Sequence, residues 1–568
     1  MEAGKRKISD IFSRASKLSI PHFQRSYVWD EEQWDRFLDD MIYASKNNHP
    51  YFMGSVILKQ QETTTLQGDI RTIIDGQQRL TTFLLFFKAL FIKNETPEKF
   101  NQIFTKFDGQ NILDHNYSDK PLFDKILNDN EIEAPDRRGQ IFKCYEYFLK
   151  NIQANTIDSN ILLSNILFVG IELQQNEDEQ QIFDTINSLG IRLTTAELLK
   201  NYLFNKDLDL YNRNWRDVFE IDREVKGYWD QDVTTGRNKR SNIDLFLQSY
   251  LFIKIQEKEI NVNSEDKERF FKIESVFNSY KEFIKNYELD TDLIINEIKE
   301  YASVYKNIVN PKIVGQDINP SDYAQRLNLV MFGLETATII PYVLYVSKKV
   351  ASQDEKNKIF RYLEAYLMRR IVCRNTPKNY NQLFRSFINN EIDTLEKLKE
   401  IIEAKGDKLN SMPSDAEVQT GFNQSIMVNK QAKGVLYLIE RSIRNDLHST
   451  ELKCFNDYSL EHVLPKKWRN KWTGENLTSQ QEDERDNLIL TLGNLTLITK
   501  QLNSSIRDSD WDTKKNGSGQ NHGLVQYAAG IEIFSRYLQK DSWNEECIRE
   551  RADELRNYAV GRVWNLNF

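Results

Sequence analysis

The stretch Ser459–Trp468, SLEHVLPKKW, places an acid and a histidine side by side as Glu461 and His462. Two asparagines follow in LGNLTLITKQLN, as Asn494 and Asn503. Hydrolysis of a phosphodiester needs a base that activates water and an electrophile that takes up charge on the leaving oxygen. An acid–histidine pair followed by two spaced asparagines supplies the groups for both tasks, and therefore predicts a one-metal phosphodiesterase site.

The chemistry of each of these four side chains predicts its role. His462 is the candidate base, because the unperturbed pKa of imidazole lies near neutrality. Glu461 and Asn503 are candidate ligands for a divalent cation, Mg²⁺ or Mn²⁺, since hard cations prefer oxygen. Asn494 is grouped with His462 as catalytic, and is expected to bond backbone atoms at a tight turn and brace a hairpin. If a β-hairpin carries Glu461 and His462, their side chains point to opposite faces.

A basic segment, PKKWRNKW at residues 465–472, follows the acid–histidine pair and interleaves cations with two tryptophans. Such a segment suits phosphate contact and stacking on bases. A solvated charged loop explains the pattern equally well. The candidate DNA contacts are Lys466, Lys467, Arg469 and Lys471.

A second polar motif, DGQQR at residues 75–79, joins a predicted strand to a predicted buried helix. Gly76 permits a tight turn, and the amides at the N-terminus of the next helix form an anion site. Arg79 can pair with a phosphate through two hydrogen bonds, and Asp75 can hold a metal or a ribose hydroxyl. Strand–turn–helix units of this kind are common and the chain has no P-loop, so the motif alone is a weak indicator of nucleotide binding.

The upstream segment IPHFQRSYVW, residues 20–29, adds Gln24 and Arg25 to this group. Tyr27 and Trp29 in the same segment are predicted to be core residues. For Gln24, Arg25 and Arg79 the alternative is an internal polar network that clamps the fold.

Composition excludes several classes of protein. A chain of 568 residues is too long for one core, so two to four domains are expected. The net charge of −8 gives no global basic field, so nucleic acid must be held by local patches. The 4 cysteines are scattered without a CxxC pair, and no signal segment or apolar membrane span is evident, which predicts a soluble, cytoplasmic protein with reduced thiols.

Periodicity divides the chain into three predicted domains, at 1–210, 211–415 and 416–568. The first alternates strands at 51–60, 71–76 and 166–173 with helices, including a buried one at 77–93 and others capped at Asp30 and Thr194, which predicts an α/β or α+β domain. The second is predicted to be almost wholly helical, without strand signals and with exposed loops at 234–242 and 404–415. The third carries the acid–histidine pair among helices. The fold class is multidomain, mainly α with α+β portions.

One cluster in the helical region stands apart from these motifs. Arg369, Arg370 and Arg374 crowd a single predicted helix, LMRRIVCRN. In a chain of negative net charge they could face DNA or the first domain. Helix-dipole compensation and ordinary salt bridges explain the cluster equally well.

The order EHVLP…LGNLTLI…LN…W…K, within residues 436–515, resembles the His-Asn-His (HNH, ββα-metal) nucleases. The resemblance implies an acid–histidine pair on a β-hairpin, a central asparagine that steadies the loop, and a final asparagine that completes the metal site. One departure is Glu461, where many relatives have aspartate.

Four ordered motifs in residues 8–204, namely IPHFQRSYVW, YFMGSVIL, IIDGQQRLTT and IFDTINSLGIRLTTAELLKN, resemble the N-terminal domain of GmrSD-type modification-dependent restriction enzymes. The resemblance implies a ParB/sulfiredoxin-like fold, binding and hydrolysis of an NTP (ATP or GTP), and sensing of modified DNA. The implied nucleotide-binding residues are Gln24, Arg25, Asp75, Gly76, Gln77, Gln78 and Arg79. Asn187 and Arg192 are implied as sensor residues, with turn chemistry around Gly190 as the alternative.

Together these motifs predict an NTP-regulated, metal-dependent endonuclease that cleaves modified phage DNA, similar to type IV restriction enzymes and SspE-type anti-phage effectors. The predicted partners are DNA and a nucleotide, and no membrane association is expected. Whether the chain forms a homo-oligomer is left open. Two alternatives remain. The chain could be an NTP-switched DNA-binding sensor with an idle nuclease site, or an NTPase switch that acts on a protein partner.

Overall fold

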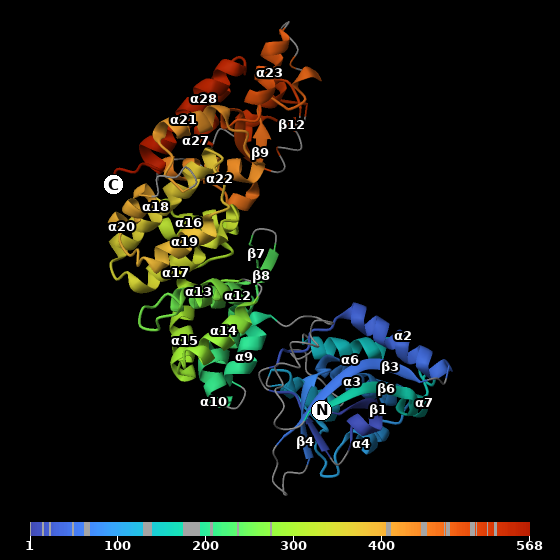
Figure 1. Cartoon of the computed structure of the whole chain (residues 1–568). Coiled ribbons are helices and arrows are strands. Elements are labelled where there is room, and N and C mark those ends of the chain that lie inside the picture. The colour runs from blue at the N-terminus through green and yellow to red at the C-terminus, as the bar shows by residue number, and fades with distance from the viewer. Residues whose placement is uncertain are drawn as a thin grey trace. The chain divides into compact units, whose positions relative to one another are not determined.

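The computed structural model describes all residues except 1, 14–15, 22–23, 48–49, 62–68, 117, 129–138, 174–193, 205–207, 236–237, 273–274, 405–409, 445–450, 471, 473–476, 500–501, 503–505, 507, 520 and 528–530. The chain forms two compact units, Met1–Arg213 and Asn214–Phe568 (Figure 1). It is multidomain and mostly helical, with one mixed sheet, as the sequence predicts. The position predicted as a border, residue 415, lies inside the second unit.

The first unit is built on a six-stranded mixed sheet with the order β1-β6-β3-β4-β2-β5. β3 pairs with β4 in antiparallel and with β6 in parallel orientation. The strands are β1 (Glu2–Lys7), β2 (Ser16–Ser19), β3 (Tyr51–Gln60), β4 (Asp69–Asp75), β5 (Leu113–Asp114) and β6 (Ile166–Leu173). The three strands predicted in this region are confirmed as β3, β4 and β6.

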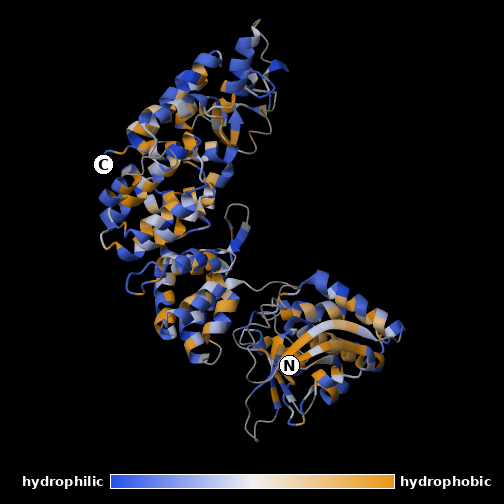
Figure 2. Ribbon diagram, in the orientation of Figure 1, coloured by the Kyte–Doolittle hydropathy of each residue, from blue (hydrophilic) through white to orange (hydrophobic). Residues whose placement is uncertain are grey.

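Helix α3 (Gln77–Lys93) is the centre of the first unit's core, and nearly all of it is buried. Phe83 and Phe86 pack edge-on against Phe37 of α2 (Glu31–Asn47). Figure 2 shows apolar residues concentrated on the central strands of this sheet. The other helices are α1 (Ile8–Ile11), α4 (Glu98–Phe104), α5 (Lys120–Asn128), α6 (Gln140–Asn151), α7 (Ser159–Asn165), α9 (Thr195–Phe204) and α10 (Leu208–Tyr211).

Both helix caps predicted in this unit are confirmed. Asp30 Oδ1 accepts from the amide of Glu32, and Asp30 N donates to the side chain of Gln33. At the start of α9, Thr194 and Glu197 form a reciprocal pair: Thr194 N donates to the Glu197 carboxylate, and Glu197 N donates to the Thr194 hydroxyl. A side chain that accepts from a free amide of the first turn stabilises a helix end by about 1 kcal/mol.

The second unit begins with a helical region. Its elements are η3 (Asn212–Glu220), α11 (Arg223–Trp229), α12 (Asn242–Lys254), α13 (Ser264–Phe270), α14 (Val276–Asn286), α15 (Thr291–Ile308), η5 (Ile313–Gly315), α16 (Tyr323–Asn328), η6 (Leu329–Gly333), η7 (Ala337–Ile339), α17 (Ile340–Lys349), α18 (Gln353–Val372), α19 (Tyr380–Asn389), α20 (Leu395–Ala404), α21 (Asp415–Gln424) and α22 (Asn429–Ile443).

The helical region contains a β-hairpin, so the prediction of a region without strands, with a loop at 234–242, is wrong there. Strands β7 (Asp232–Thr235) and β8 (Asn238–Ser241) pair in antiparallel register. Val233 is buried at its base, and Arg240 across from it bonds Gln248 of α12. A hairpin of two strands is marginal by itself, so this packing against α12 accounts for a strand pair that local polarity did not predict.

Arg369 and Arg370 of α18 are buried, so these two do not face DNA, whereas Arg374 lies beyond the end of α18 and is exposed. Arg369 donates to the carbonyl oxygen of Trp564 at 2.8 and 3.0 Å and pairs with Asp415 at 2.8 Å. Arg370 donates to the carbonyls of Ser411 and Thr376. The two guanidinium groups therefore tie together segments that lie far apart in the sequence.

The C-terminal part of the second unit contains the acid–histidine pair and packs on α22. Its elements are η8 (Phe455–Asp457), β9 (Tyr458–His462), η9 (Trp468–Asn470), α23 (Ser479–Leu488), η10 (Leu492–Asn494), β10 (Leu495–Thr499), α25 (Trp511–Asn516), β11 (Gly517–Ser518), β12 (Asn521–His522), α26 (Leu524–Tyr527), α27 (Glu532–Ser535), η11 (Arg536–Gln539), α28 (Glu545–Tyr558) and η12 (Ala559–Val563). Among the described helices, none is long and apolar enough to cross a bilayer.

Candidate active site

Glu461 and His462 are the last two residues of β9, which pairs in antiparallel register with β10. Glu461 lies opposite Thr496, and His462 lies opposite Leu495. Successive side chains of a strand point to opposite faces. Glu461 is accordingly 6% exposed, whereas His462 is only half-buried. The imidazole is the member of the pair that solvent can reach.

Asn494 holds the chain that leaves β9. Its side-chain oxygen accepts from the amide of Leu464 at 2.8 Å and from the indole of Trp543 at 3.0 Å. Its side-chain nitrogen donates to the carbonyls of Leu464 at 2.8 Å and Ile489 at 3.0 Å. Asn494 is fully buried. These bonds match the bracing role expected for this asparagine, and they leave its amide out of reach of a substrate.

Helix α28 supports the turn that carries Asn494. Arg551 is fully buried and donates to the carbonyls of Gly493 at 2.9 Å and Leu495 at 2.7 Å. A Cβ at Gly493 would lie 2.1 Å from the carbonyl oxygen of Ile548. Only glycine allows this approach, so the turn and α28 are fixed together.

Glu461 is paired with a lysine that the sequence interpretation did not assign. Lys514 of α25 is fully buried, and its ammonium forms an ion pair with Glu461 Oε1. The same ammonium donates to the carbonyl oxygen of His462 at 2.8 Å. Burial raises the pKa of Glu461 and lowers that of Lys514, while their mutual attraction opposes both changes. Lys514 therefore links the carboxylate of Glu461 to the backbone carbonyl of His462, the candidate base.

His462 lies in a positive environment. Burial, followed by the charges of Lys466 and Lys514, lowers the pKa of His462 to about 4. A neutral imidazole can accept a proton, whereas an imidazolium cannot. The side chain is therefore in its basic form at neutral pH.

Only some of the groups near Glu461 are suited to bind a cation. No group of three or more His, Cys, Asp or Glu residues that could hold a metal occurs among the described residues. Asn503, the second predicted ligand, lies outside the described residues. The hydroxyl of Thr496, opposite Glu461, is buried and has no hydrogen-bond partner among the described residues. A carboxylate beside an unpaired hydroxyl offers oxygen donors of the kind that Mg²⁺ accepts.

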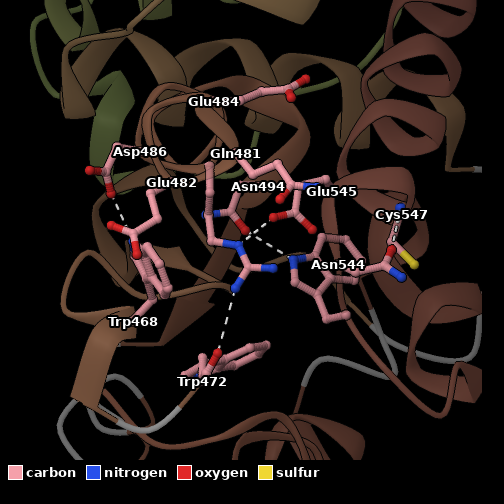
Figure 3. A network of polar contacts seen from close by, with 12 residues as sticks. Trp468, Trp472, Gln481, Glu482, Glu484, Asp486, Asn494, Asn544, Glu545 and Cys547 are labelled. Carbon is pink, nitrogen blue, oxygen red and sulfur yellow. Dashed lines mark hydrogen bonds and ion pairs between the residues drawn. The ribbon is translucent and has the colours of Figure 1, made fainter. Parts of the chain in front are cut away.

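The cations of the basic segment after β9 differ in their contacts. Arg469 pairs with Glu482 at 3.1 Å and Asp486 at 2.9 Å, both on α23. Trp468 donates to Asp486 at 2.7 Å (Figure 3). Lys466 and Lys467 are exposed. Lys471 lies outside the described residues. Of the predicted DNA contacts that are described, the two lysines point to solvent and the arginine is engaged by acids.

In the first unit, the DGQQR motif and the Gln24–Val28 segment come together. Gln78 accepts from the amide of Val28 at 2.9 Å and donates to the carbonyl of Ser26 at 3.3 Å. Gln24 donates to the carbonyl of Ile73 at 2.8 Å. Gln78 thus acts as a clamp between the two motifs. Tyr27 is buried in the core, as predicted, with its hydroxyl bonded to Thr82.

Arg79 folds back from α3 onto the strand that precedes it. It pairs with Asp75 at 3.2 Å and donates to the carbonyl of Met53 at 3.4 Å. Gly54 has a φ of +102°, and a Cβ there would lie 2.2 Å from the guanidinium of Arg79. Gly76 has a φ of +104° at the N-terminus of α3. Both glycines are required by the geometry of this turn.

Among the described residues, Arg25 Nε and Gln77 Oε1 of this cluster are buried and find no hydrogen-bond partner. No side chain caps the N-terminus of α3, which begins at Gln77. A buried donor without a partner is unfavourable by about 1–3 kcal/mol. The first-turn amides and the Arg25 guanidinium are therefore groups that an anionic ligand could satisfy.

The remaining sensor candidates, Asn187 and Arg192, lie outside the described residues. Lys514 and Trp543 belong to the site but were not assigned roles from the sequence. The nuclease motif ends in a tryptophan and a lysine, and Trp511 and Lys514 fit these positions. This part of the motif was the sequence signal that could have pointed to Lys514.

Comparison with protein families agrees with both motif sets. Residues 8–204 match the family model described as GmrSD restriction endonuclease, N-terminal domain. Residues 412–558 match the model described as GmrSD restriction endonucleases, C-terminal domain. No curated protein matches the chain. The two matches confirm the resemblance to GmrSD restriction enzymes.

Proposed function

The chain belongs to the GmrSD family of restriction endonucleases, and we propose that it is an NTP-regulated, metal-dependent endonuclease that cleaves modified foreign DNA. In this proposal the C-terminal part is an HNH nuclease, and the first unit is a ParB-like domain that binds the nucleotide. The observation that carries the nuclease assignment is His462, a half-buried histidine of lowered pKa at the end of β9, next to an Asn494 whose amide is fully used in bracing the turn.

In the cleavage step, His462 takes a proton from the attacking water. Its neutral form is favoured by burial and by the neighbouring lysine charges. Asn494 and Arg551 keep the turn after His462 fixed, so the imidazole needs little reorganisation. A divalent metal held by Glu461 and Asn503 would supply positive charge to the leaving oxygen. The exposed Lys466 and Lys467 are suited to contact the DNA backbone.

The nucleotide assignment rests on the cluster at the N-terminus of α3. Uncapped amides, the unpartnered Arg25 Nε and the Arg79 guanidinium are donors suited to a phosphate chain. The Asp75 carboxylate beside Arg79 is suited to a ribose hydroxyl or a metal. Gln77 and Gln78 hold the Gln24–Val28 segment against this end of the helix.

The test is cleavage of a panel of modified and unmodified DNAs, with Mg²⁺ and with or without each NTP. Wild type is expected to cut a subset of modified DNAs in an NTP-dependent manner, and His462→Ala is expected to lose this activity. Equal cleavage by both proteins would overturn the site. Tight DNA binding without nicking under any nucleotide would favour a sensor, and NTP hydrolysis indifferent to DNA would favour a switch acting on a protein partner.

A further inference from the structure

The turn between β5 and α5 holds the segment that carries Arg25. We propose that Asn116, in this turn, is a positioning residue of the nucleotide site, which fixes the backbone of Arg25 so that its guanidinium faces the phosphate chain. This inference rests on the proposed function, because it assigns to Asn116 a task at the same site.

The side chain of Asn116 joins two parts of the first unit. Its nitrogen donates to the carbonyl oxygen of Arg25 at 3.0 Å, 91 residues away in the chain. Its oxygen accepts from the amide of Asp119 at 3.0 Å and from the hydroxyl of Ser118 at 3.1 Å. The last two bonds close the turn that leads into α5. Asn116 therefore fixes the Arg25 peptide group to the start of that helix.

Two further groups hold the same stretch of backbone. The carboxylate of Asp119 accepts from the amide of Tyr27 at 2.6 Å and from Asn116 Nδ2 at 3.3 Å. Gln77 Nε2, at the start of α3, donates to the carbonyl oxygen of Arg25 at 3.3 Å. The backbone from Arg25 to Tyr27 is thus held between the starts of α5 and α3.

Asn116 can act on a ligand only through the residues that it holds. It is 0% exposed. A side-chain amide offers two hydrogens and an oxygen with two acceptor directions. In Asn116 all four are engaged by the protein, two of them by the turn before α5 and one by Arg25.

The side chain of Arg25 points to the purpose of this clamp. Arg25 Nε is buried and finds no hydrogen-bond partner among the described residues. Buried polar groups of folded proteins are nearly always paired, and an unpaired one is unfavourable. A clamp that only stabilised the fold would gain nothing by holding this donor unpaired, whereas a phosphate oxygen would pair with it. Together with the uncapped amides of α3, this donor favours a ligand with several anionic oxygens.

Asn111 provides a matched control for the test. It is half-buried, and its side-chain nitrogen donates to Asp124 of α5 at 2.8 Å. Among the described contacts, its side chain bonds no part of the Arg25 segment. Asn111→Ala therefore loosens the same helix without releasing Arg25.

The experiment titrates the full chain with fluorescent analogues of ATP and GTP and, in competition, with inorganic triphosphate. Asn116→Ala is expected to weaken the binding of triphosphate, and of the analogue that wild type binds, by about tenfold, because a charge-assisted hydrogen bond is lost. Asn111→Ala should bind within about twofold of wild type, and thermal unfolding reports the stability of both variants. A folded Asn116→Ala protein that binds like Asn111→Ala overturns the inference and leaves nucleotide binding in place.

A double-mutant cycle with Arg25→Met tests whether Asn116 acts through Arg25. In that background, Asn116→Ala is expected to change the triphosphate affinity by less than about twofold, because the guanidinium is already absent. A further tenfold loss there overturns the inference. Asn116→Ser makes the same test if the alanine variant does not fold, because a serine hydroxyl can still accept in such a turn but ends one bond short of the Asn116 nitrogen. Wild type that binds neither nucleotide nor triphosphate at millimolar concentration ends the nucleotide assignment together with the inference.

Discussion

The indole nitrogen of Trp543 lies 3.0 Å from the side-chain oxygen of Asn494, which also accepts from the backbone of Leu464. One amide thus joins an aromatic wall to the turn that follows His462. The asparagine of this motif is a structural brace, whereas His462 is the proposed catalytic base. The first prediction tests these separate roles.

Asn494→Ala is expected to destabilise the fold and to reduce cleavage. It leaves the amide and carbonyl of Leu464, and the indole of Trp543, buried without partners. Each such group is unfavourable by about 1–3 kcal/mol, so a loss of about 3 kcal/mol or more is expected in chemical unfolding. Asn470→Ala, at an exposed position, is the control and should unfold like wild type. A stable Asn494→Ala protein that is inactive would instead indicate direct catalysis by the amide.

A second prediction concerns the proton affinity of His462. The folded-state pKa is about 4, below the usual 6.5. As pH falls, the unfolded chain therefore binds this proton first, and His462 removes stability between about pH 6.5 and 4. At pH 5.5 an ordinary imidazole would be about nine-tenths protonated, whereas His462 should remain neutral.

Nuclear magnetic resonance of histidine labelled at Cε1 measures this directly, and the spectrum of His462→Ala identifies the signal among the 6 histidines. Lys466→Met should raise the midpoint, because Lys466 is among the charges that lower the pKa. Lys467→Met provides the comparison and should leave the midpoint in place. A wild-type midpoint above about 6 would contradict the prediction.

The third prediction concerns Gly54, which makes room for the guanidinium of Arg79. A Cβ at Gly54 would lie 2.2 Å from Arg79 Nη1, so Gly54→Ala should displace Arg79 and weaken nucleotide binding at least tenfold. The backbone strain at a φ of +102° adds about 1 kcal/mol or more of destabilisation. Gly109→Ala separates the two effects, because Gly109 has a φ of +82° with nothing within 4 Å of its Cβ position.

Titration with a fluorescent NTP analogue, combined with thermal unfolding, reads out both quantities. Both variants should lose stability, and only Gly54→Ala should lose nucleotide binding. Equal nucleotide binding by the two variants would show that Arg79 does not serve the nucleotide.

Sequence pattern predicted those parts of this fold that depend on local chemistry. The strands β3, β4 and β6 and the caps at Asp30 and Thr194 follow from alternation and from short-range hydrogen bonds. The acid–histidine motif likewise marked β9.

Local pattern could not predict which charged side chains are buried, because their partners lie far away in the chain. Nothing in the sequence indicates that Arg369 is buried, because its acceptor, the carbonyl of Trp564, lies 195 residues away in the chain. Lys514 and Lys515 are equivalent in sequence, and only the position of α25 against β9 decides which one reaches Glu461. The β7–β8 hairpin was missed for the same reason, since its stability comes from α12.

The fourth prediction separates the cations of the basic segment. Arg469 is held by Glu482 and Asp486 on α23, whereas in the described part of the chain no ion pair engages the exposed Lys466 or Lys467. A cation that is already paired gains little from a phosphate, because it must give up its acidic partners. The logarithm of the DNA association constant falls linearly with the logarithm of salt concentration, and removal of one cation that binds a phosphate makes this slope shallower by about 0.9.

The combined change Lys466→Ala and Lys467→Ala should therefore make the slope shallower by up to about 2, while Arg469→Ala should leave it unchanged. Fluorescence anisotropy of labelled duplex DNA across a salt series measures the slopes, with Mg²⁺ withheld so that no cleavage occurs. A larger drop for Arg469→Ala than for the lysine pair would mean that DNA displaces the acids of α23, and that this helix moves on binding.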